Sequence, residues 1–145
     1  MRNKPKARPA RSTDFQSLTV RQVMGKLQKS VRLGTKADVV ASLMIEGQGA
    51  VPVVDDANKL VGIVSEHDLL AAIDGGHALK ALAAGDVMTA NPYAIPLETT
   101  LGTLVHVLSA SDLVRVPVVD HDGKVVGVVA RRDLLRSYLK SSLQK

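Results

Sequence analysis

Two polar residues, Ser65 and Asp68, stand three positions apart where an apolar run gives way to a helical pattern. A serine hydroxyl can donate a hydrogen bond and a carboxylate can accept several, so the pair could hold the polar groups of a ligand. The same spacing is also typical of a helix N-terminus, with serine as the N-cap and aspartate in the first turn. The pattern by itself leaves both roles open.

A second stretch repeats this pattern 65 residues later, with Asp133 matching the aspartate but Ala130 in place of Ser65. Alanine is a poor N-cap and offers no side-chain hydrogen bond. Arg131 and Arg132 follow it, and guanidinium groups are suited to anions. Either this second site is degenerate, or its anion contacts come from the arginines. A plainer alternative is that both arginines are solvated helix residues.

Catalytic chemistry is not indicated by the remaining polar residues. The chain has no cysteine, and its four histidines show no metal-ligand spacing with one another: His67, His77, His106 and His121. No pairing of a nucleophile with a general base can be identified in the sequence. Gly47-Gln48-Gly49 lacks the remaining glycine of the dinucleotide-binding motif. We therefore expect no enzyme activity, no catalytic residue and no metal site.

Composition indicates one globular module that builds its core from aliphatic side chains. Of the 145 residues, 46% are hydrophobic, and only Phe15, Tyr93 and Tyr138 are aromatic. So few aromatic side chains disfavour single-stranded nucleic-acid binding by stacking. No apolar run approaches the roughly 18 residues of a membrane-spanning helix. The N-terminus has no apolar segment of a secretory signal, and we expect a cytoplasmic protein.

The positive charge is concentrated at the N-terminus, where Arg2, Lys4, Lys6, Arg8 and Arg11 lie. Removing these five from the nineteen basic residues leaves fourteen, equal to the fourteen acidic residues. We expect residues 1–17 to form a basic disordered tail. Its role is open between solubilisation, which we favour, and an arm for nucleic acid or anionic lipid.

The chain is a tandem repeat. Positions 51–70 and 116–135 share twelve of twenty residues, including two copies of Val-Pro-Val-Val-Asp. Each half is expected to follow the order β-α-β-β-α, with a parallel first crossover and then an antiparallel hairpin. The ranges of the expected strands are 30–33, 50–55 and 60–65, then 93–96, 114–120 and 125–130. The ranges of the expected helices are 20–24, 35–46, 68–73, 77–84, 100–109 and 131–143. Thr35 and Asp38 suggest a capping box for the second of these helices.

These motifs together resemble the CBS domain pair, named after cystathionine β-synthase. The resemblance is carried by Val23-Met24 and Val87-Met88, by the two Val-Pro-Val-Val-Asp stretches, and by two Gly-apolar-Val-x-x-x-Asp-Leu stretches. It implies an α+β fold (of α/β type) in which two β-α-β-β-α repeats, residues 18–76 and 77–145, pack sheet to sheet with pseudo-twofold symmetry. One repeat has a core too small to stand alone.

The resemblance further implies a regulatory module that binds an adenosine-containing ligand between the repeats and controls a separate partner. AMP, ADP, ATP and S-adenosylmethionine are the candidate ligands, no cofactor is required, and a homodimer is implied. The candidate binding residues are Ser65, Asp68, His67, Val51, Pro52, Val53, Asp133, Arg131, Arg132, Val116, Pro117 and Tyr93.

In this assignment Ser65 and Asp68 face the nucleotide and His67 reaches a phosphate at the cleft mouth. The Val-Pro-Val stretch forms an apolar wall for the base. Tyr93 either packs against the base or is a half-buried strand residue. The competing hypothesis for the whole chain is a ligand-free dimerisation or scaffold module.

Overall fold

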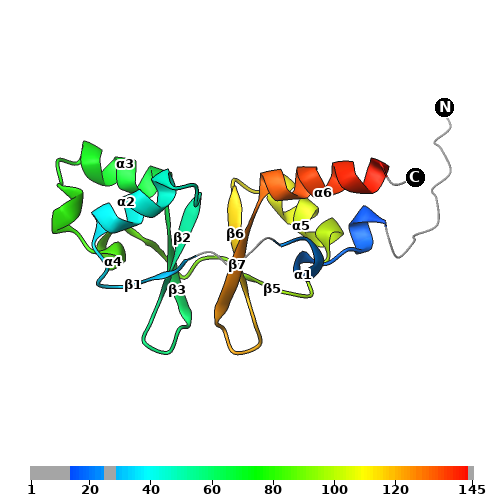
Figure 1. Cartoon of the computed structure of the whole chain (residues 1–145), viewed down its shortest axis with the longest axis horizontal. Coiled ribbons are helices and arrows are strands. Elements are labelled where there is room, and N and C mark those ends of the chain that lie inside the picture. The colour runs from blue at the N-terminus through cyan, green and yellow to red at the C-terminus, as the bar shows by residue number, and fades with distance from the viewer. Residues whose placement is uncertain (1–13, 25–28, 144–145) are drawn as a thin grey trace.

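The computed structural model describes residues 14–24 and 29–143, which form two similar lobes side by side (Figure 1). The expectation of a disordered tail falls mainly on residues 1–13, which lie outside the described residues. The last residues of the expected disordered tail are ordered, because Phe15–Ser17 form a short 3₁₀ helix, η1. The ring of Phe15 lies edge-on to that of Tyr138, with centroids 5.4 Å apart.

The first lobe is built on a four-stranded sheet in the order β1-β2-β3-β4. Its strands are β1 (Val31–Arg32), β2 (Ala50–Val54), β3 (Leu60–Ser65) and β4 (Thr89–Ala90). Strands β1 and β2 are parallel, β2 and β3 form an antiparallel hairpin, and the register pairs Val51 with Val64. The expected order is confirmed, and β4 is an additional edge strand that the repeat pattern did not predict.

The second lobe repeats this arrangement with a three-stranded sheet. Its strands are β5 (Ile95–Pro96), β6 (Arg115–Val119) and β7 (Val125–Ala130), and Val116 pairs with Val129. The hairpin turns also match, because Asn58 and Gly123 both have positive φ, at 66° and 81°. An isolated bridge between Lys59 and Lys124 joins the two turns.

Helices cover one side of each sheet (Figure 1). In the first lobe they are α2 (Ala37–Ile45) and α3 (Glu66–Asp74), and in the second α5 (Leu101–Ser109) and α6 (Arg131–Leu143). Shorter helical turns are α1 (Val20–Val23), η2 (Leu79–Ala81) and α4 (Ala84–Val87). Among the described residues, no helix is long and apolar enough to cross a membrane.

Three expected helices differ from the observed ones by two residues or more at one end. The helix expected over 68–73 extends over Glu66–Asp74. The helix expected from Thr35 begins at Ala37, and the Thr35 hydroxyl instead accepts a hydrogen bond from the Arg32 N–H at 3.1 Å. A threonine can satisfy either a helix end or a turn, and here it stabilises the turn after β1. The helix expected over 77–84 is only the 3₁₀ turn η2, and α4 follows it as a separate turn.

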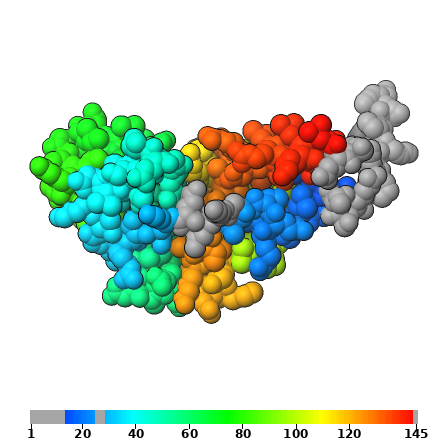
Figure 2. All heavy atoms as spheres, viewed as in Figure 1, coloured from blue at the N-terminus to red at the C-terminus, as the bar shows by residue number. Residues whose placement is uncertain are grey.

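The first α-helix of each expected repeat packs in the core of the other lobe. Val20 of α1 is fully buried with Leu101 and Leu104 of the second lobe. Ala84 of α4 is fully buried with Val40 of the first lobe. In Figure 2 the blue atoms of α1 accordingly lie against the orange and red second lobe. The first expected repeat begins at Leu18, but residues 18–24 pack in the core of the second lobe.

Two methionines complete this exchange. A Cβ placed on Gly62 of β3 would collide with the side chain of Met88, which follows α4. A Cβ on Gly127 of β7 would lie 2.5 Å from the Sδ of Met24, which follows α1. The glycine in each repeated motif is thus needed because the methionine of the exchanged segment crosses directly over the strand.

Candidate functional site

A cavity of about 650 Å³ opens between the two lobes, and we call it the first cleft. Its volume lies within the range of small-molecule sites. Both lobes and the segment that joins them supply its walls. The lining residues are Ala50, Ile63, Ser65, Glu66, His67 and Asp68, then Thr89, Asn91, Pro92 and Tyr93, and Asp112, Leu113, Val114, Arg115 and Pro117.

Ser65 and Asp68 form the N-terminal cap of α3, as one of the two sequence hypotheses expected. The Asp68 N–H donates to Ser65 Oγ at 3.2 Å. In return, Asp68 Oδ2 accepts from the Ser65 N–H at 2.8 Å and from the Ser65 hydroxyl at 3.0 Å. This reciprocal pattern fixes both side chains at the point where β3 passes into α3. Capping and lining the cleft are therefore compatible roles.

The second carboxylate oxygen of Asp68 keeps acceptor capacity. Among the described residues, the only hydrogen-bond donor to Oδ1 is the Thr89 hydroxyl, at 3.5 Å, which is a long hydrogen bond. Asp68 is half-buried, and a carboxylate oxygen can accept more than one hydrogen bond. The site can therefore offer a fixed, charged acceptor to hydroxyl groups of a ligand.

Three further predicted residues line the first cleft from different elements. His67 is exposed on the first turn of α3, and Tyr93, 49% exposed, lies on the joining segment before β5. Pro117 is buried in β6 of the second lobe. A histidine, an aromatic ring and a proline are thus brought around one cavity with the Ser65–Asp68 pair.

The Val-Pro-Val stretches do not form the expected apolar wall, apart from Pro117. Val51 and Val53 are fully buried in the first lobe, and Val116 is fully buried in the second. Successive strand residues point to opposite faces of a sheet, so the valines face the helices. Pro52 is also buried, and none of these four residues is among those that line the two clefts.

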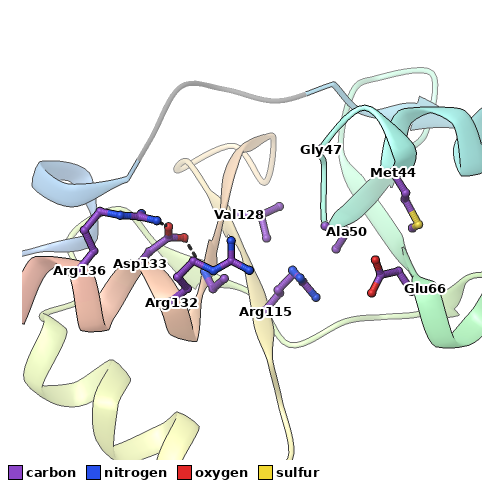
Figure 3. Close-up of a pocket in the computed structure, with 11 residues that line it drawn as sticks. Met44, Gly47, Ala50, Glu66, Arg115, Val128, Arg132, Asp133 and Arg136 are labelled. Carbon is purple, nitrogen blue, oxygen red and sulfur yellow. Dashed lines mark hydrogen bonds and ion pairs between the residues drawn. The ribbon is translucent and has the colours of Figure 1, made fainter.

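A second, smaller cavity of about 290 Å³ lies beside the first, and we call it the second cleft (Figure 3). Three arginines, one glutamate and one aspartate supply its charged side chains. The lining residues are Met44, Gly47, Gly49, Ala50 and Glu66 of the first lobe, and Arg115, Val128, Ala130, Arg132, Asp133 and Arg136 of the second.

The aspartate of the second repeat is engaged on both oxygens. Asp133 Oδ2 accepts from the Ala130 N–H at 2.8 Å, and Oδ1 pairs with Arg136 at 3.0 Å (Figure 3). Because Ala130 has no hydroxyl, two of the three cap contacts of the first repeat are missing, and only the bond from the Ala130 N–H remains. This carboxylate is therefore a weaker candidate than Asp68 for binding ligand hydroxyls.

The two arginines that follow Ala130 have different surroundings. Arg132 lines the second cleft, as expected for an anion contact. Arg131 does not line either cleft, because its guanidinium donates to the backbone carbonyls of Leu113, at 2.9 Å, and Ser111, at 3.3 Å. It fastens the loop before β6 and is not positioned as the expected phosphate ligand.

Two aspartates in the hairpin turns have lowered pKa values. The pKa of Asp55 is lowered by backbone hydrogen bonds from Lys59 and Ala57, and the pKa of Asp120 by the matching bonds from Lys124 and Asp122. These groups stabilise the hairpin turns. No group of three or more histidine, aspartate or glutamate side chains able to hold a metal gathers within residues 14–24 and 29–143.

Sequence reasoning missed Arg115, which lines both clefts. The signal was present, because Arg115 occupies the position that Ala50 holds in the first repeat, directly before Val-Pro-Val. It also missed Thr89 and Asn91 of the joining segment, which no repeated motif marks.

Comparisons with known proteins agree with this architecture. A family model described as the CBS domain matches residues 20–75 and 84–140. The structure of CBSX2 from Arabidopsis thaliana in complex with AMP is 30% identical to this chain, with a TM-score of 0.74. The match covers 88% of this chain and 99% of the CBSX2 chain.

Two curated relatives are similar over most of this chain. The chloroplastic CBS domain-containing protein CBSX1 of Arabidopsis thaliana is 31% identical over 138 residues, covering 76% of this chain and 58% of the relative. An uncharacterized protein of Methanocaldococcus jannaschii is 29% identical over 103 residues, covering 71% of this chain. The chain spans only 24% of that longer relative.

Proposed function

The chain belongs to the CBS domain family, and on that premise we propose that it is a regulatory module that binds an adenosine-containing ligand in the first cleft. AMP, ADP, ATP and S-adenosylmethionine are the candidate ligands. The module acts without catalysis, by changing the shape that it presents to a separate partner protein.

One observation carries the proposal, namely the Asp68 carboxylate in the wall of a ligand-sized cavity. Its Oδ2 is held by two donors of Ser65, while Oδ1 has only a distant neighbour, Thr89. A fixed carboxylate of this kind suits the paired hydroxyls of a ribose, and charged hydrogen bonds contribute about 1.5–3 kcal/mol each. Tyr93 and Pro117 supply apolar surface for a base. The AMP complex of the 30% identical CBSX2 supports the same ligand class.

The placement of the first cleft suits a regulatory role. Asp68 belongs to the first lobe, Pro117 to the second, and Tyr93 to the segment between them. A ligand that contacts all three favours the arrangement of lobes in which they converge. Such a ligand shifts a conformational equilibrium only by its differential affinity for the two arrangements.

A homodimer is part of the proposal. Leu135, Leu139 and Leu143 recur at helical spacing on α6 and are 65%, 60% and 83% exposed. Leu70 on α3 is 64% exposed, and both helices lie along the same edge of the molecule in Figure 1. Several exposed large apolar side chains on helices along one edge are typical of a protein interface.

Asp68→Ala tests the ligand site. At a hundredfold excess over Kd, a ligand stabilises the folded protein by about 2.7 kcal/mol, which raises the thermal midpoint by roughly 5–10 °C for a chain of this size. We expect at least one of the four candidate ligands to raise the midpoint of the parent protein, and Asp68→Ala to abolish that rise. Isothermal titration calorimetry should lose the corresponding heat.

Asp86→Ala is the matched control. Asp86 Oδ2 accepts from the Ala83 N–H at 2.8 Å, so it caps α4 as Asp68 caps α3, but it lines neither cleft. It should lower the midpoint by its capping contribution alone and keep the response to ligand. Midpoints that do not respond to any of the four ligands, in any of these proteins, would favour the ligand-free dimerisation module instead.

A further inference from the structure

The two clefts share a wall, in which Arg115 is the only cation. Ala50, Glu66 and Arg115 line both cavities, so the first cleft continues directly into the second. Arg115 comes from β6 of the second lobe and Glu66 from the first turn of α3 in the first lobe. A ligand that extends from the first cleft into the second would therefore lie close to Arg115.

Arg115 is held in place without a carboxylate partner. It is half-buried, and its guanidinium packs so closely on Gly49 that a Cβ there would collide with it. Within the described part of the chain, no side-chain hydrogen bond or ion pair of Arg115 is found. A partly buried cation costs free energy unless an anion compensates it, so this position is suited to an anionic ligand.

The second cleft extends this positive surface. Arg132 also has no ion pair within residues 14–24 and 29–143, and in Figure 3 it lies beside Arg115, between Asp133 and Glu66. The third arginine, Arg136, is neutralised by Asp133. The described lining of the second cleft therefore holds three positive and two negative side chains, so its net charge is positive.

We propose that this site selects nucleoside polyphosphates over the monophosphate. The base and ribose occupy the first cleft, and the phosphate chain runs past Arg115 to Arg132 in the second. The inference rests on the proposed function and adds the ligand class. A monophosphate in the same pose reaches Arg115 at most, whereas a triphosphate spans to Arg132, and guanidinium groups bind phosphate oxygens bidentately.

Calorimetric titration of the full chain with AMP, ADP and ATP tests the proposal. We expect affinity to rise from AMP to ATP. Arg132→Gln should weaken ATP binding about tenfold or more while leaving AMP binding unchanged, as expected for a lost charged hydrogen bond. Arg115→Gln should weaken ATP binding at least as much. Glu66→Gln should change ATP affinity in the opposite direction, because it removes the opposing charge.

Two further variants separate charge from position. Gly49→Ala keeps every charge but displaces the Arg115 guanidinium, so it should weaken ATP binding more than AMP binding. Arg32→Gln removes an arginine that is paired with Asp56 and lines neither cleft, and it should leave both affinities unchanged. Arg132 is exposed, so its variant should fold even if Arg115→Gln does not.

The outcomes distinguish this inference from the proposed function. Equal affinities for AMP and ATP, both abolished by Asp68→Ala and both insensitive to Arg132→Gln and Gly49→Ala, would overturn the polyphosphate inference and leave the adenosine site standing. Absence of binding by all three nucleotides would overturn the inference. Titration with S-adenosylmethionine would then be the remaining test of the proposed function.

Discussion

Three aspartates, Asp68, Asp86 and Asp133, each accept a hydrogen bond at 2.8 Å from the backbone N–H three residues earlier. All three stabilise the start of a helix, so this contact alone does not mark a binding residue. The other oxygen distinguishes them. In Asp133 it is paired with Arg136, while in Asp68 it keeps acceptor capacity within a cleft. Function at this scale depends on which lone pairs the fold leaves available.

The turn aspartates Asp55 and Asp120 should make stability depend on acidity. Their pKa values lie below the ordinary 3.8 because backbone N–H groups bind the charged form. A lowered native pKa contributes stability that is present above the unfolded value and is lost as pH falls through the native value. We expect the unfolding free energy of the parent to drop below about pH 4.

The variant with Asp55→Asn and Asp120→Asn should show a shallower decline over the same range. Urea unfolding at a series of pH values measures this slope. Parallel curves for the parent and the double variant would show that other carboxyl groups govern the acid response.

At the scale of elements, the repeated strands β3 and β7 are each crossed by a methionine from an exchanged segment. The contacts are not equivalent. A Cβ on Gly127 would meet only the flexible side chain of Met24, whereas a Cβ on Gly62 would meet Met88 and also the Thr89 carbonyl, at 3.1 Å. A side chain can move away more easily than the backbone of an edge strand.

Alanine substitutions should reveal this difference. Gly62→Ala should destabilise the protein by about 1–3 kcal/mol, the usual range for overpacking, and Gly127→Ala by less. Denaturant unfolding of the two variants gives the comparison directly. If Gly127→Ala were the more damaging substitution, the Thr89 backbone would not be the limiting contact.

At the scale of the whole molecule, neither lobe has a complete core of its own. Val20 reaches the second lobe and Ala84 the first, and backbone hydrogen bonds fix both segments. Val20 N–H donates to the Thr99 carbonyl at 2.9 Å, and Ala84 N–H to that of Thr35 at 2.6 Å. We therefore expect the two lobes to unfold together.

Val20→Ala tests this linkage. Removing two buried carbons should cost about 2–3 kcal/mol and lower one common transition, seen alike by circular dichroism and by tyrosine fluorescence. Val39→Ala is the matched control, because Val39 is 49% exposed. Two separate transitions, of which only one shifts, would show that the lobes are independent.

The proposed dimer is tested on α6. Leu139→Asp places a charge in the exposed apolar stripe, so it should shift the protein from dimer to monomer in light scattering. Ala57→Asp, on a hairpin turn at the opposite edge in Figure 1, should leave the dimer intact. A monomeric parent protein, or a dimer in both variants, would place any association elsewhere.

Much of the fold could be predicted because the motifs of the main strands occur twice in the sequence. The boundaries of β3, β7 and α6 agree with the expected ranges. The exchange of α1 and α4 could not be predicted, because hydrophobic periodicity shows that Val20 is buried but not against which lobe. The strand β4 was missed because the described second sheet has no matching strand, so no repeated motif marks it.

Part of the candidate site could be predicted from the sequence and part could not. The family resemblance suggested Ser65, Asp68 and Tyr93 as cleft residues, and all three line the first cleft. Arg131 and Arg132 could not be told apart, because their roles depend on which carbonyls a neighbouring loop presents. The valines of Val-Pro-Val were misplaced because alternation along the strand turns them toward the core.

The exchanged helices α1 and α4 also bear on ancestry. A chain carrying a single repeat would leave its own core open and hold, in its leading segment, the piece that a second copy needs. Two such chains could close only by trading those segments, as in a domain-swapped dimer. A half-length chain of this kind would therefore be expected to form an intertwined pair, and joining two copies makes the same exchange intramolecular. The joined copies need not be identical, and here Ser65 corresponds to Ala130 and Arg115 to Ala50.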